Sequence, residues 1–231
     1  MKILAVDSCT NIATGAILND GVIAAEFAVN NKTTHSEKLL PQIENMLINT
    51  GLTYKDIDLF AVTTGPGSFT GERIGVATAK ALAHAVNKPV VGVSALAALA
   101  YNIAYTDYLI CPIMDARRQQ VYTAVFTFED GKIKRIKPDS AMSAEDLLKE
   151  FDKDVIFIGD GVPVFKDIIE QKLGRLCHFA PAHLLNIRGG SVALCAKENF
   201  ENGQACSYKE LVPLYLRLSQ AEREYNDRIG K

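Results

Sequence analysis

Short apolar segments alternate with longer segments of helical spacing along the first hundred residues. Five segments have the length and composition of buried strands: 2–6, 14–18, 22–29, 59–62 and 89–93. Three segments have the spacing or the alanine content of helices: 34–50, 76–86 and 94–104. A hairpin turn signal, Asn19-Asp20-Gly21, joins the second strand to the third, and Thr34 and Glu37 form a capping box before the first helix.

The same order of elements is predicted again in the second half of the chain. Strands are expected at 109–114, 121–128, 132–136 and 155–158, and helices at 143–151, 164–172 and 187–200. In each half an acid, Asp7 or Asp115, follows the first strand. We interpret this order as an internal duplication, although any α/β chain allows a comparable division. Two such lobes would place Asp7 and Asp115 on either side of a cleft, beyond the carboxyl ends of the strands.

The predicted elements divide the chain into two lobes. We expect the first lobe to comprise residues 1–106 and a second, smaller lobe to comprise residues 107–231. The C-terminal helical segment, 187–200, would pack back on the first lobe. A semi-extended run at 211–219 precedes a charged tail.

The stretch 63–75, Thr-Thr-Gly-Pro-Gly-Ser-Phe-Thr-Gly-Glu-Arg-Ile-Gly, lies between a predicted strand and a predicted helix. The glycines on either side of Pro66 tolerate positive φ, and proline fixes the bend between them. Ser68 or Thr70 would cap the helix. Such a turn exposes backbone N–H groups at the positive end of a helix, which suits an anion or the carboxylate of a partner.

Two nucleotide-binding motifs fail at this stretch. A P-loop requires Lys after its last Gly, whereas Gly71 is followed by Glu72. The dinucleotide fingerprint requires G-x-G-x-x-G, and here the last interval, from Gly67 to Gly71, is one residue too long. The stretch is therefore either a turn that binds an anion or a partner, or a tight turn without a ligand, and spacing alone does not distinguish the two.

Composition excludes several classes of protein. The chain has 231 residues, of which 48% are hydrophobic, enough for a real core. A net charge of −2 provides no strong basic field to hold nucleic acid unaided. The five cysteines are scattered without a C-x-x-C, which indicates free thiols in a reducing compartment. No apolar run reaches membrane-spanning length, so we expect a cytoplasmic protein without membrane contact.

The sequence resembles the TsaB (YeaZ) family at motifs spread over nearly the whole chain. The most specific is Gly-Pro-Gly-Ser-Phe-Thr-Gly at 65–71, followed by Arg73-Ile74-Gly75. Further matches lie at 3–8, 35–41, 115–122 and 213–217. One difference is Glu72, where the family pattern favours an apolar residue, and we expect it to change only the local surface beside the turn.

The resemblance implies an α/β fold of the duplicated actin-like, sugar-kinase-like kind (ASKHA, RNase H-like). It also implies a role in making N6-threonylcarbamoyladenosine beside the anticodon of tRNAs that read codons starting with A. In that role the chain would form a heterodimer with its catalytic paralogue TsaD, which the P-loop ATPase TsaE joins. ATP would bind at the complex, and tRNA would be contacted only through it. When TsaD is lacking, the same surface would support a homodimer.

The chain lacks the patterns that unaided catalysis would need. No two of its four histidines have the spacing of metal ligands, so we predict neither a catalytic residue nor a metal. The turns after the two strand-end acids lack the Gly that lets phosphates approach, which leaves Asp7, Thr10 and Asp115 as weak candidates for a cofactor site. We expect a non-catalytic scaffold or activator that needs no cofactor; the alternative is a stand-alone ATPase or small-molecule kinase.

The helix after the Gly-rich stretch predicts a surface for the partner. Gly75, Ala79 and Ala83 recur every four residues and give a small-residue face, which permits close helix approach. We expect this helix and the first helix to form half of a four-helix interface with TsaD, through His35, Leu39, Leu40, Ile43, Leu47, Thr70, Arg73, Gly75, Ala79 and Leu82. The alternative is that both helices are wholly internal.

Overall fold

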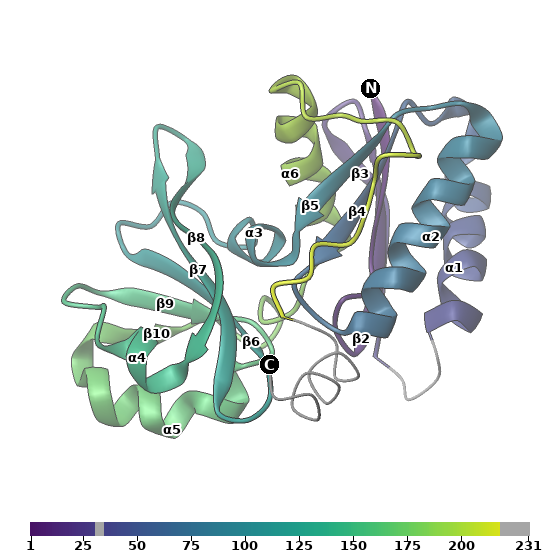
Figure 1. Cartoon of the computed structure of the whole chain (residues 1–231). Coiled ribbons are helices and arrows are strands. Elements are labelled where there is room, and N and C mark those ends of the chain that lie inside the picture. The colour runs from purple at the N-terminus through teal and green to yellow at the C-terminus, as the bar shows by residue number, and fades with distance from the viewer. Residues whose placement is uncertain (31–34, 218–231) are drawn as a thin grey trace, which may run out of the picture.

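A computed structural model describes residues 1–30 and 35–217 and shows two lobes, each built on a five-stranded sheet (Figure 1). The strands of the first sheet are β1 (Lys2–Asp7), β2 (Ile12–Asn19), β3 (Val22–Asn30), β4 (Leu59–Gly65) and β5 (Val90–Ser94). The helices among them are α1 (His35–Thr50), the 3₁₀ turn η1 (Tyr54–Asp56), α2 (Phe69–Val86) and, after β5, α3 (Ala95–Ala100).

The second lobe repeats this plan. Its strands are β6 (Leu109–Asp115), β7 (Gln120–Glu129), β8 (Lys132–Ser143), β9 (Val155–Ile158) and β10 (Cys177–Phe179). Its helices are α4 (Ala144–Leu148), α5 (Val162–Leu173), the 3₁₀ turn η2 (Gly174–Leu176) and, after β10, α6 (Gly189–Glu201). The sequence pattern did not predict β10, because a three-residue segment with a histidine at its centre is too short to be recognised as a strand.

The two sheets have the same topology. The first has the order β3-β2-β1-β4-β5, and the second has the order β8-β7-β6-β9-β10. In each sheet the first three strands along the chain pair antiparallel, and the last two extend the sheet as parallel strands. The predicted internal duplication and the two-lobed α/β fold are therefore confirmed.

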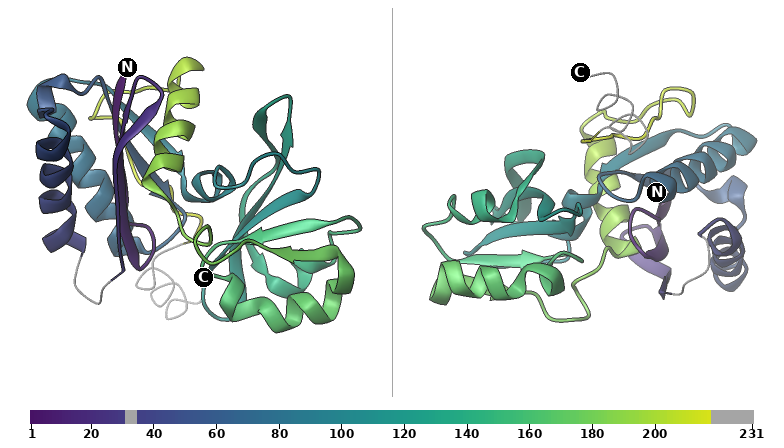
Figure 2. Two further views of the ribbon diagram at one scale, coloured as in Figure 1. Left: turned by 180° about the vertical axis from the view of Figure 1, so that it is seen from behind. Right: turned by 60° about the horizontal axis from the view of Figure 1, so that its bottom comes forward.

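Helices cover both faces of the first sheet (Figure 2). On one face α1 and α2 form a core in which Ile43 and Ala79 pack with Phe60 of β4. On the other face α6 contacts β1 and β2, and α3 contacts β6 and β7 of the second sheet. Because the last helix of each half packs on the sheet of the other half, a continuous core that includes Leu96 and Val192 joins the two lobes.

The helix α2 begins earlier than the sequence pattern predicts. We expected it to start at Val76, after a long turn, but it starts at Phe69, and the Ser68 side chain accepts a hydrogen bond from the Gly71 N–H (3.3 Å). Gly71 suggested a turn, yet it is required for packing: a Cβ there would lie 1.9 Å from the Ser8 carbonyl oxygen. Ser68 is thus the cap; the capping box predicted for α1 involves Thr34, which lies outside the described residues.

The chain returns to the first lobe at its end. Residues 206–217, here called the C-terminal strap, form a bridge between Cys206 and Val90 of β5. Farther along, the Leu214 N–H donates to the Thr64 carbonyl oxygen (2.8 Å). Arg217 then donates to the Ala116 carbonyl oxygen of the second lobe (2.7 Å). The strap therefore lies beside β4 and β5 and reaches across to the lobe that contains β6.

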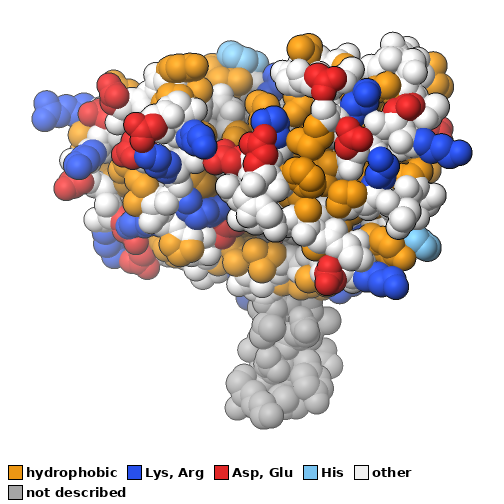
Figure 3. Space-filling view, turned by 90° about the horizontal axis from the view of Figure 1, so that it is seen from above, with side chains coloured by type: hydrophobic (Ala, Val, Ile, Leu, Met, Phe, Trp, Pro, Cys, Tyr) orange, Lys and Arg blue, Asp and Glu red, His pale blue; other side chains and the backbone are white. Residues whose placement is uncertain are grey.

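Charged side chains of both signs are interspersed on the face seen in Figure 3, with hydrophobic groups among them. This mixture agrees with the net charge of −2 and offers no extended basic field on that face. Among the described residues, no helix has the length and apolar character that a membrane crossing requires.

The contact between α6 and β2 gives a test of the lobe packing. We expect Gly189→Ala to lower the free energy of unfolding by about 1 to 3 kcal/mol, because its Cβ would lie 2.3 Å from the carbonyl carbon of Gly15. Gly190→Ala is the matched control, since its nearest neighbour would be 3.4 Å away, and it should be neutral or slightly stabilising. Urea unfolding measures both, and equal stabilities would contradict this packing.

Candidate functional site

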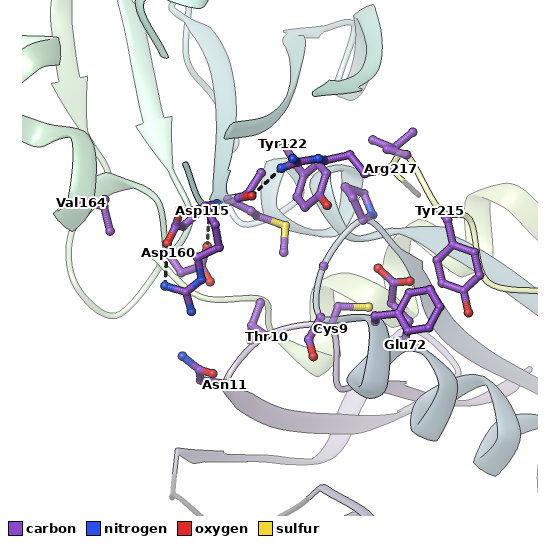
Figure 4. A pocket seen from close by; sticks show the side chains of 18 of the residues that line it. Cys9, Thr10, Asn11, Glu72, Asp115, Tyr122, Asp160, Val164, Tyr215 and Arg217 are labelled. Atoms are coloured by element: carbon purple, nitrogen blue, oxygen red, sulfur yellow. Dashed lines mark hydrogen bonds and ion pairs between the residues drawn. The ribbon is translucent and has the colours of Figure 1, made fainter. Parts of the chain in front are cut away.

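A cleft of about 600 Å³ lies between the two lobes (Figure 4). Its walls come from the β1–β2 turn, the start of α2, the end of β6, the start of α5 and the C-terminal strap. The lining residues are Cys9, Thr10, Asn11, Pro66, Gly67, Ser68, Phe69, Glu72, Met114, Asp115, Ala116, Arg117, Arg118, Tyr122, Asp160, Val164, Tyr215, Leu216 and Arg217. Two of the three weak candidates, Thr10 and Asp115, thus line one cleft.

Asp7, the third candidate, lies beneath the cleft rather than on its wall. Its side chain is fully buried, and Oδ1 accepts hydrogen bonds from the Cys9 N–H (3.0 Å) and from the Thr63 hydroxyl. Burial raises the pKa of the Asp7 carboxyl, and these hydrogen bonds oppose the rise. The contacts join the end of β1 to β4, so Asp7 fixes the floor of the cleft.

The wall of the second lobe carries two acids that interact through the backbone. Asp115 Oδ2 forms an ion pair with Arg117 Nη1 (3.0 Å), and its Oδ1 accepts from the Arg117 N–H (2.8 Å). Asp160 Oδ1 accepts from the Asp115 N–H (3.3 Å). Burial raises the pKa of Asp160, and the nearby charge of Asp115 adds to the effect.

Asp160 was not among the residues predicted from the sequence, although the chain contains a signal for it. Gly159-Asp160-Gly161 follows β9 and precedes α5, as Gly65-Pro66-Gly67 follows β4 and precedes α2. The first glycine of each turn has a similar positive φ, 116° for Gly159 and 123° for Gly65. Aligning the two halves of the chain would therefore have placed Asp160 opposite Pro66 and identified it as a residue of the cleft.

The backbone N–H groups of the Gly-rich turn are largely bound within the chain. The Ser68 N–H donates to the Cys9 carbonyl oxygen (2.7 Å), and the Gly71 N–H donates to the Ser68 hydroxyl (3.3 Å). The Gly67 N–H hydrogen bonds to the Glu72 carboxylate. A Cβ at Gly67 would lie 2.3 Å from the Cys9 carbonyl oxygen. The glycines here permit close packing of two backbone turns, and the negative group at the turn belongs to the chain itself.

Glu72 is not the surface residue that the sequence analysis expected. Its side chain is 2% exposed, and one carboxylate oxygen, Oε2, has no hydrogen-bond partner among the described residues. Burial raises its pKa to about 7, while the Gly67 N–H and the charge of Arg73 oppose the rise. Figure 4 shows Glu72 on the first-lobe wall, near Cys9 and Tyr215. The chain thus has a carboxyl that titrates near neutral pH at the start of α2.

The turn after β6 has an unusual backbone. Arg117, Arg118 and Gln119 have positive φ values of 64°, 56° and 60°, in the left-handed region that costs energy for residues other than glycine. Arg117 pairs with Asp115, whereas Arg118 lines the cleft and is exposed. The turn therefore contributes two exposed cations, Arg117 and Arg118, to the lining of the cleft.

The ten residues expected at a partner surface divide into two groups. Five are buried in the chain's own core: Leu39, Ile43, Leu47, Gly75 and Ala79. A Cβ at Gly75 would lie 2.6 Å from Ser8 Oγ and 3.2 Å from Val62 Cγ2, so this small-residue face packs on its own sheet. Their assignment to an exposed surface is wrong. The other five are exposed or half-buried: His35, Leu40, Thr70, Arg73 and Leu82.

Two of these accessible residues form contacts within the chain. His35 Nε2 lies 2.7 Å from the Thr10 carbonyl oxygen, to which it donates, and so fixes the start of α1 beside the β1–β2 turn. The Arg73 guanidinium lies 3.9 Å from the centroid of the Phe69 ring, and its Nε donates to the Tyr215 hydroxyl (2.9 Å). Because the rings of Phe69 and Tyr215 are stacked, Arg73 holds the C-terminal strap to the start of α2.

Metal-binding side chains do not gather in the described part of the chain. No group of three or more His, Cys, Asp or Glu residues there has an arrangement that could hold an ion. The absence of a metal stays a prediction, which metal analysis of the purified protein can test.

Glu72 gives a test in the pH dependence of stability. Its folded-state pKa of about 7 exceeds the ordinary value of 4.5, so between these pH values the folded chain holds a proton that the unfolded chain has lost. Its contribution to stability is fully present below pH 4.5 and is lost as the pH rises through 7. We expect Glu72→Gln to be more stable than wild type at pH 8 by about 1 to 3 kcal/mol.

Urea unfolding at pH 5 and pH 8 measures this difference, with Glu44→Gln, an exposed substitution on α1, as the matched control. A Glu72→Gln variant that loses stability between pH 5 and pH 8 as steeply as wild type would contradict the burial of an ionisable group at this position.

Comparison with known proteins identifies relatives over nearly the whole chain. The TsaD family model, described as tRNA N6-adenosine threonylcarbamoyltransferase, matches residues 23–225. The chain is 36% identical over 228 residues to the tRNA threonylcarbamoyladenosine biosynthesis protein TsaB of Bacillus subtilis (strain 168), covering 97% of this chain and 98% of that protein. The protein of the same name from Escherichia coli (strain K12) is 28% identical over 231 residues, covering 94% and 95%.

Solved structures agree with this result at the level of the fold. YeaZ from Pseudomonas aeruginosa has a TM-score of 0.81 and 24% identity, covering 93% of this chain and 99% of that one. The (R)-2-hydroxyglutaryl-CoA dehydratase component A of Acidaminococcus fermentans has a TM-score of 0.50 and 14% identity, covering 86% and 98%. The expected duplicated fold of the actin-like class is therefore confirmed, and the chain belongs to the TsaB (YeaZ) family of tRNA threonylcarbamoyladenosine biosynthesis proteins.

Proposed function

We propose that the chain is a non-catalytic scaffold or activator subunit that acts with TsaD and TsaE. The complex transfers the threonylcarbamoyl group to N6 of the adenosine beside the anticodon of tRNAs that read codons starting with A. In this proposal ATP is bound at the complex, tRNA is contacted only through it, and the work takes place in the cytoplasm. Family membership supports a role in the biosynthesis of threonylcarbamoyladenosine. The hydrogen bonds that the cleft residues form within the chain support the non-catalytic role.

The observation that carries the proposal is the internal bonding of the Gly-rich turn. In a phosphate-binding turn, backbone N–H groups at a helix start are free for the ligand. Here the N–H groups of Gly67, Ser68 and Gly71 bond to acceptors of the same chain. Asp115 is likewise paired with Arg117. These three N–H groups and Asp115 are thus already engaged within the chain, which favours a role outside the cleft.

The outer faces of α1 and α2 are the proposed docking surface for TsaD. The two helices lie side by side on one flank of the first lobe (Figures 1 and 2). On α1, Leu40 is 41% exposed and Ile48 is 74% exposed. On α2, Ala77 and Ala81 are exposed and Leu82 is half-buried. Small and apolar residues together let a partner helix approach closely, and we propose the same surface for a homodimer of the isolated chain.

Reconstitution of the modification tests the proposed function directly. With purified TsaD, TsaE, tRNA, ATP and the activated threonylcarbamoyl donor, we expect product when this chain is present and none when it is omitted. The measurement is the amount of modified adenosine after nuclease digestion. Equal product in the two reactions would contradict an activating role, and product from this chain without TsaD would contradict the non-catalytic assignment.

Substitutions on α2 test the docking surface. Leu82→Glu should weaken pairing with TsaD at least tenfold, because it places a charge in a surface proposed to be desolvated on binding. Ile136→Glu, at a position on β8 that is 52% exposed, is the matched control in the other lobe and should leave pairing unchanged. Size-exclusion chromatography with titration calorimetry measures pairing. If Leu82→Glu pairs as tightly as wild type, another surface contacts TsaD.

A second candidate, a stand-alone ATPase or small-molecule kinase, is favoured by the cleft itself. The cleft is large enough for a nucleotide, and Asp115 and Asp160 are acids on its second-lobe wall. Calorimetric titration of the isolated chain with ATP and Mg²⁺ separates the two candidates. The scaffold predicts no binding at micromolar concentrations, whereas a micromolar Kd with turnover of ATP would establish the second.

A further inference from the structure

The start of α2 faces the cleft with the features of an anion site. Helix α2 is 18 residues long, and Phe69 and Glu72 of its first turn line the cleft. A helix start carries a partial positive charge, which favours an oxyanion beside it. Across the cleft, Arg118 and Arg217 also line the wall. The two walls together would attract a small dianion if nothing else occupied the place.

A side chain of the same helix already provides the negative group. The Glu72 carboxylate accepts a hydrogen bond from the Gly67 N–H, inside the turn that leads into α2. A Cβ placed on Gly65 would lie 2.9 Å from Glu72 Oε1 and 2.7 Å from the Leu214 carbonyl oxygen. The Glu72 carboxylate is therefore enclosed between the turn and the C-terminal strap. Its other oxygen, Oε2, has no partner among the described residues, and the residue lines the cleft.

We propose that Glu72 is the specificity-determining residue of the interlobe cleft. Its carboxylate places a negative charge at the start of α2, and this charge repels a tetrahedral dianion, such as phosphate or sulfate, from the part of the cleft between α2 and Arg118. Removing the negative charge, without any change of side-chain shape, removes this repulsion. The inference concerns the ligand selectivity of the isolated chain and does not depend on the proposed function, which the reconstitution assay tests separately.

The charges around Glu72 explain why its removal has this effect. From the first lobe, the acid Asp7 and the cation Arg73 act on it, and Cys9 and Tyr215 lie near it. Asp7 lies beneath the floor of the cleft whether or not Glu72 is charged. There the Thr63 hydroxyl and the Cys9 N–H donate hydrogen bonds to one of its oxygens.

The second-lobe wall contributes negative and positive charges that partly cancel each other. Asp115 pairs with Arg117, and Asp160 has a pKa raised by burial. Arg118 and Arg217 line the cleft as well, and neither forms an ion pair with a carboxylate among the described residues. Loss of the Glu72 charge therefore leaves a net positive environment for a ligand at this place.

The test is a titration with sulfate, which remains a dianion between pH 6 and pH 8. Sodium sulfate is added at constant ionic strength to wild type, Glu72→Gln, Glu72→Ala and the exposed control Glu44→Gln, and the backbone amide shifts of residues 67–72 are followed by NMR. At pH 8 we expect both Glu72 variants to bind at least tenfold more tightly than wild type and the control. Gln keeps the shape of the side chain, so the result does not depend on tolerance of Ala.

Two further measurements test whether the charge of Glu72 controls sulfate binding and whether the sulfate binds beside Arg118. Between pH 8 and pH 6, wild type should gain sulfate affinity by a larger factor than Glu72→Gln, because only wild type neutralises a carboxyl at this position. Adding Arg118→Ala to Glu72→Gln should remove most of the gain. Equal affinity of Glu72→Gln and wild type at pH 8 would overturn the proposal, and so would a gain that persists without Arg118.

Discussion

The close packing of two backbone turns is the constraint on which the site depends. Residues 65–71 lie directly on Ser8 and Cys9, and a Cβ at Gly67 or Gly71 would come within 2.3 Å or 1.9 Å of a carbonyl oxygen. Only glycine permits this approach. The contact sets the start of α2, positions the first-lobe wall of the cleft and engages the Ser68 N–H. A turn with the form of a ligand-binding turn thus serves packing in this chain.

The two lobes share a topology but differ in what they place at the cleft. The turn after β4 contains Pro66 and receives the carboxylate of Glu72, whereas the corresponding turn after β9 presents Asp160. The second wall therefore carries acids and arginines, whereas on the first wall the N–H groups of Gly67, Ser68 and Gly71 are hydrogen-bonded within the chain. This asymmetry, within a duplicated frame, agrees with the proposal that the chain acts through the flank formed by α1 and α2.

Most of the fold follows from local pattern. Strand length, hairpin signals and helical spacing locate nearly every element, and the repeated order predicts the duplication. Tertiary contacts decide where an element begins and which of its faces is buried, where the sequence pattern allows more than one answer. The start of α2 was misplaced because Gly71 suggested a turn, although packing on Ser8 requires it. The inward orientation of Gly75 and Ala79 was missed because small residues suit both an internal sheet contact and a partner helix.

The site was less predictable than the fold. Asp7, Thr10 and Asp115 follow from strand ends, but burial of Glu72 depends on the C-terminal strap, whose Leu214 lies far away in the sequence. The pairing of Arg73 with Tyr215 has the same origin. Periodicity and spacing describe neighbours along the chain, so they give no signal for contacts between segments that only the folded chain brings together.

The central claim is that this chain acts through the α1 and α2 flank and not through its cleft. Hydrogen exchange measured by mass spectrometry, on the chain alone, with ATP and Mg²⁺, and with TsaD, tests it most directly. TsaD is expected to slow exchange in α1 and α2, whereas ATP alone is expected to leave exchange in the turns at 65–72 and 115–119 unchanged. Slower exchange in both turns with ATP alone, and none in the two helices with TsaD, would contradict it.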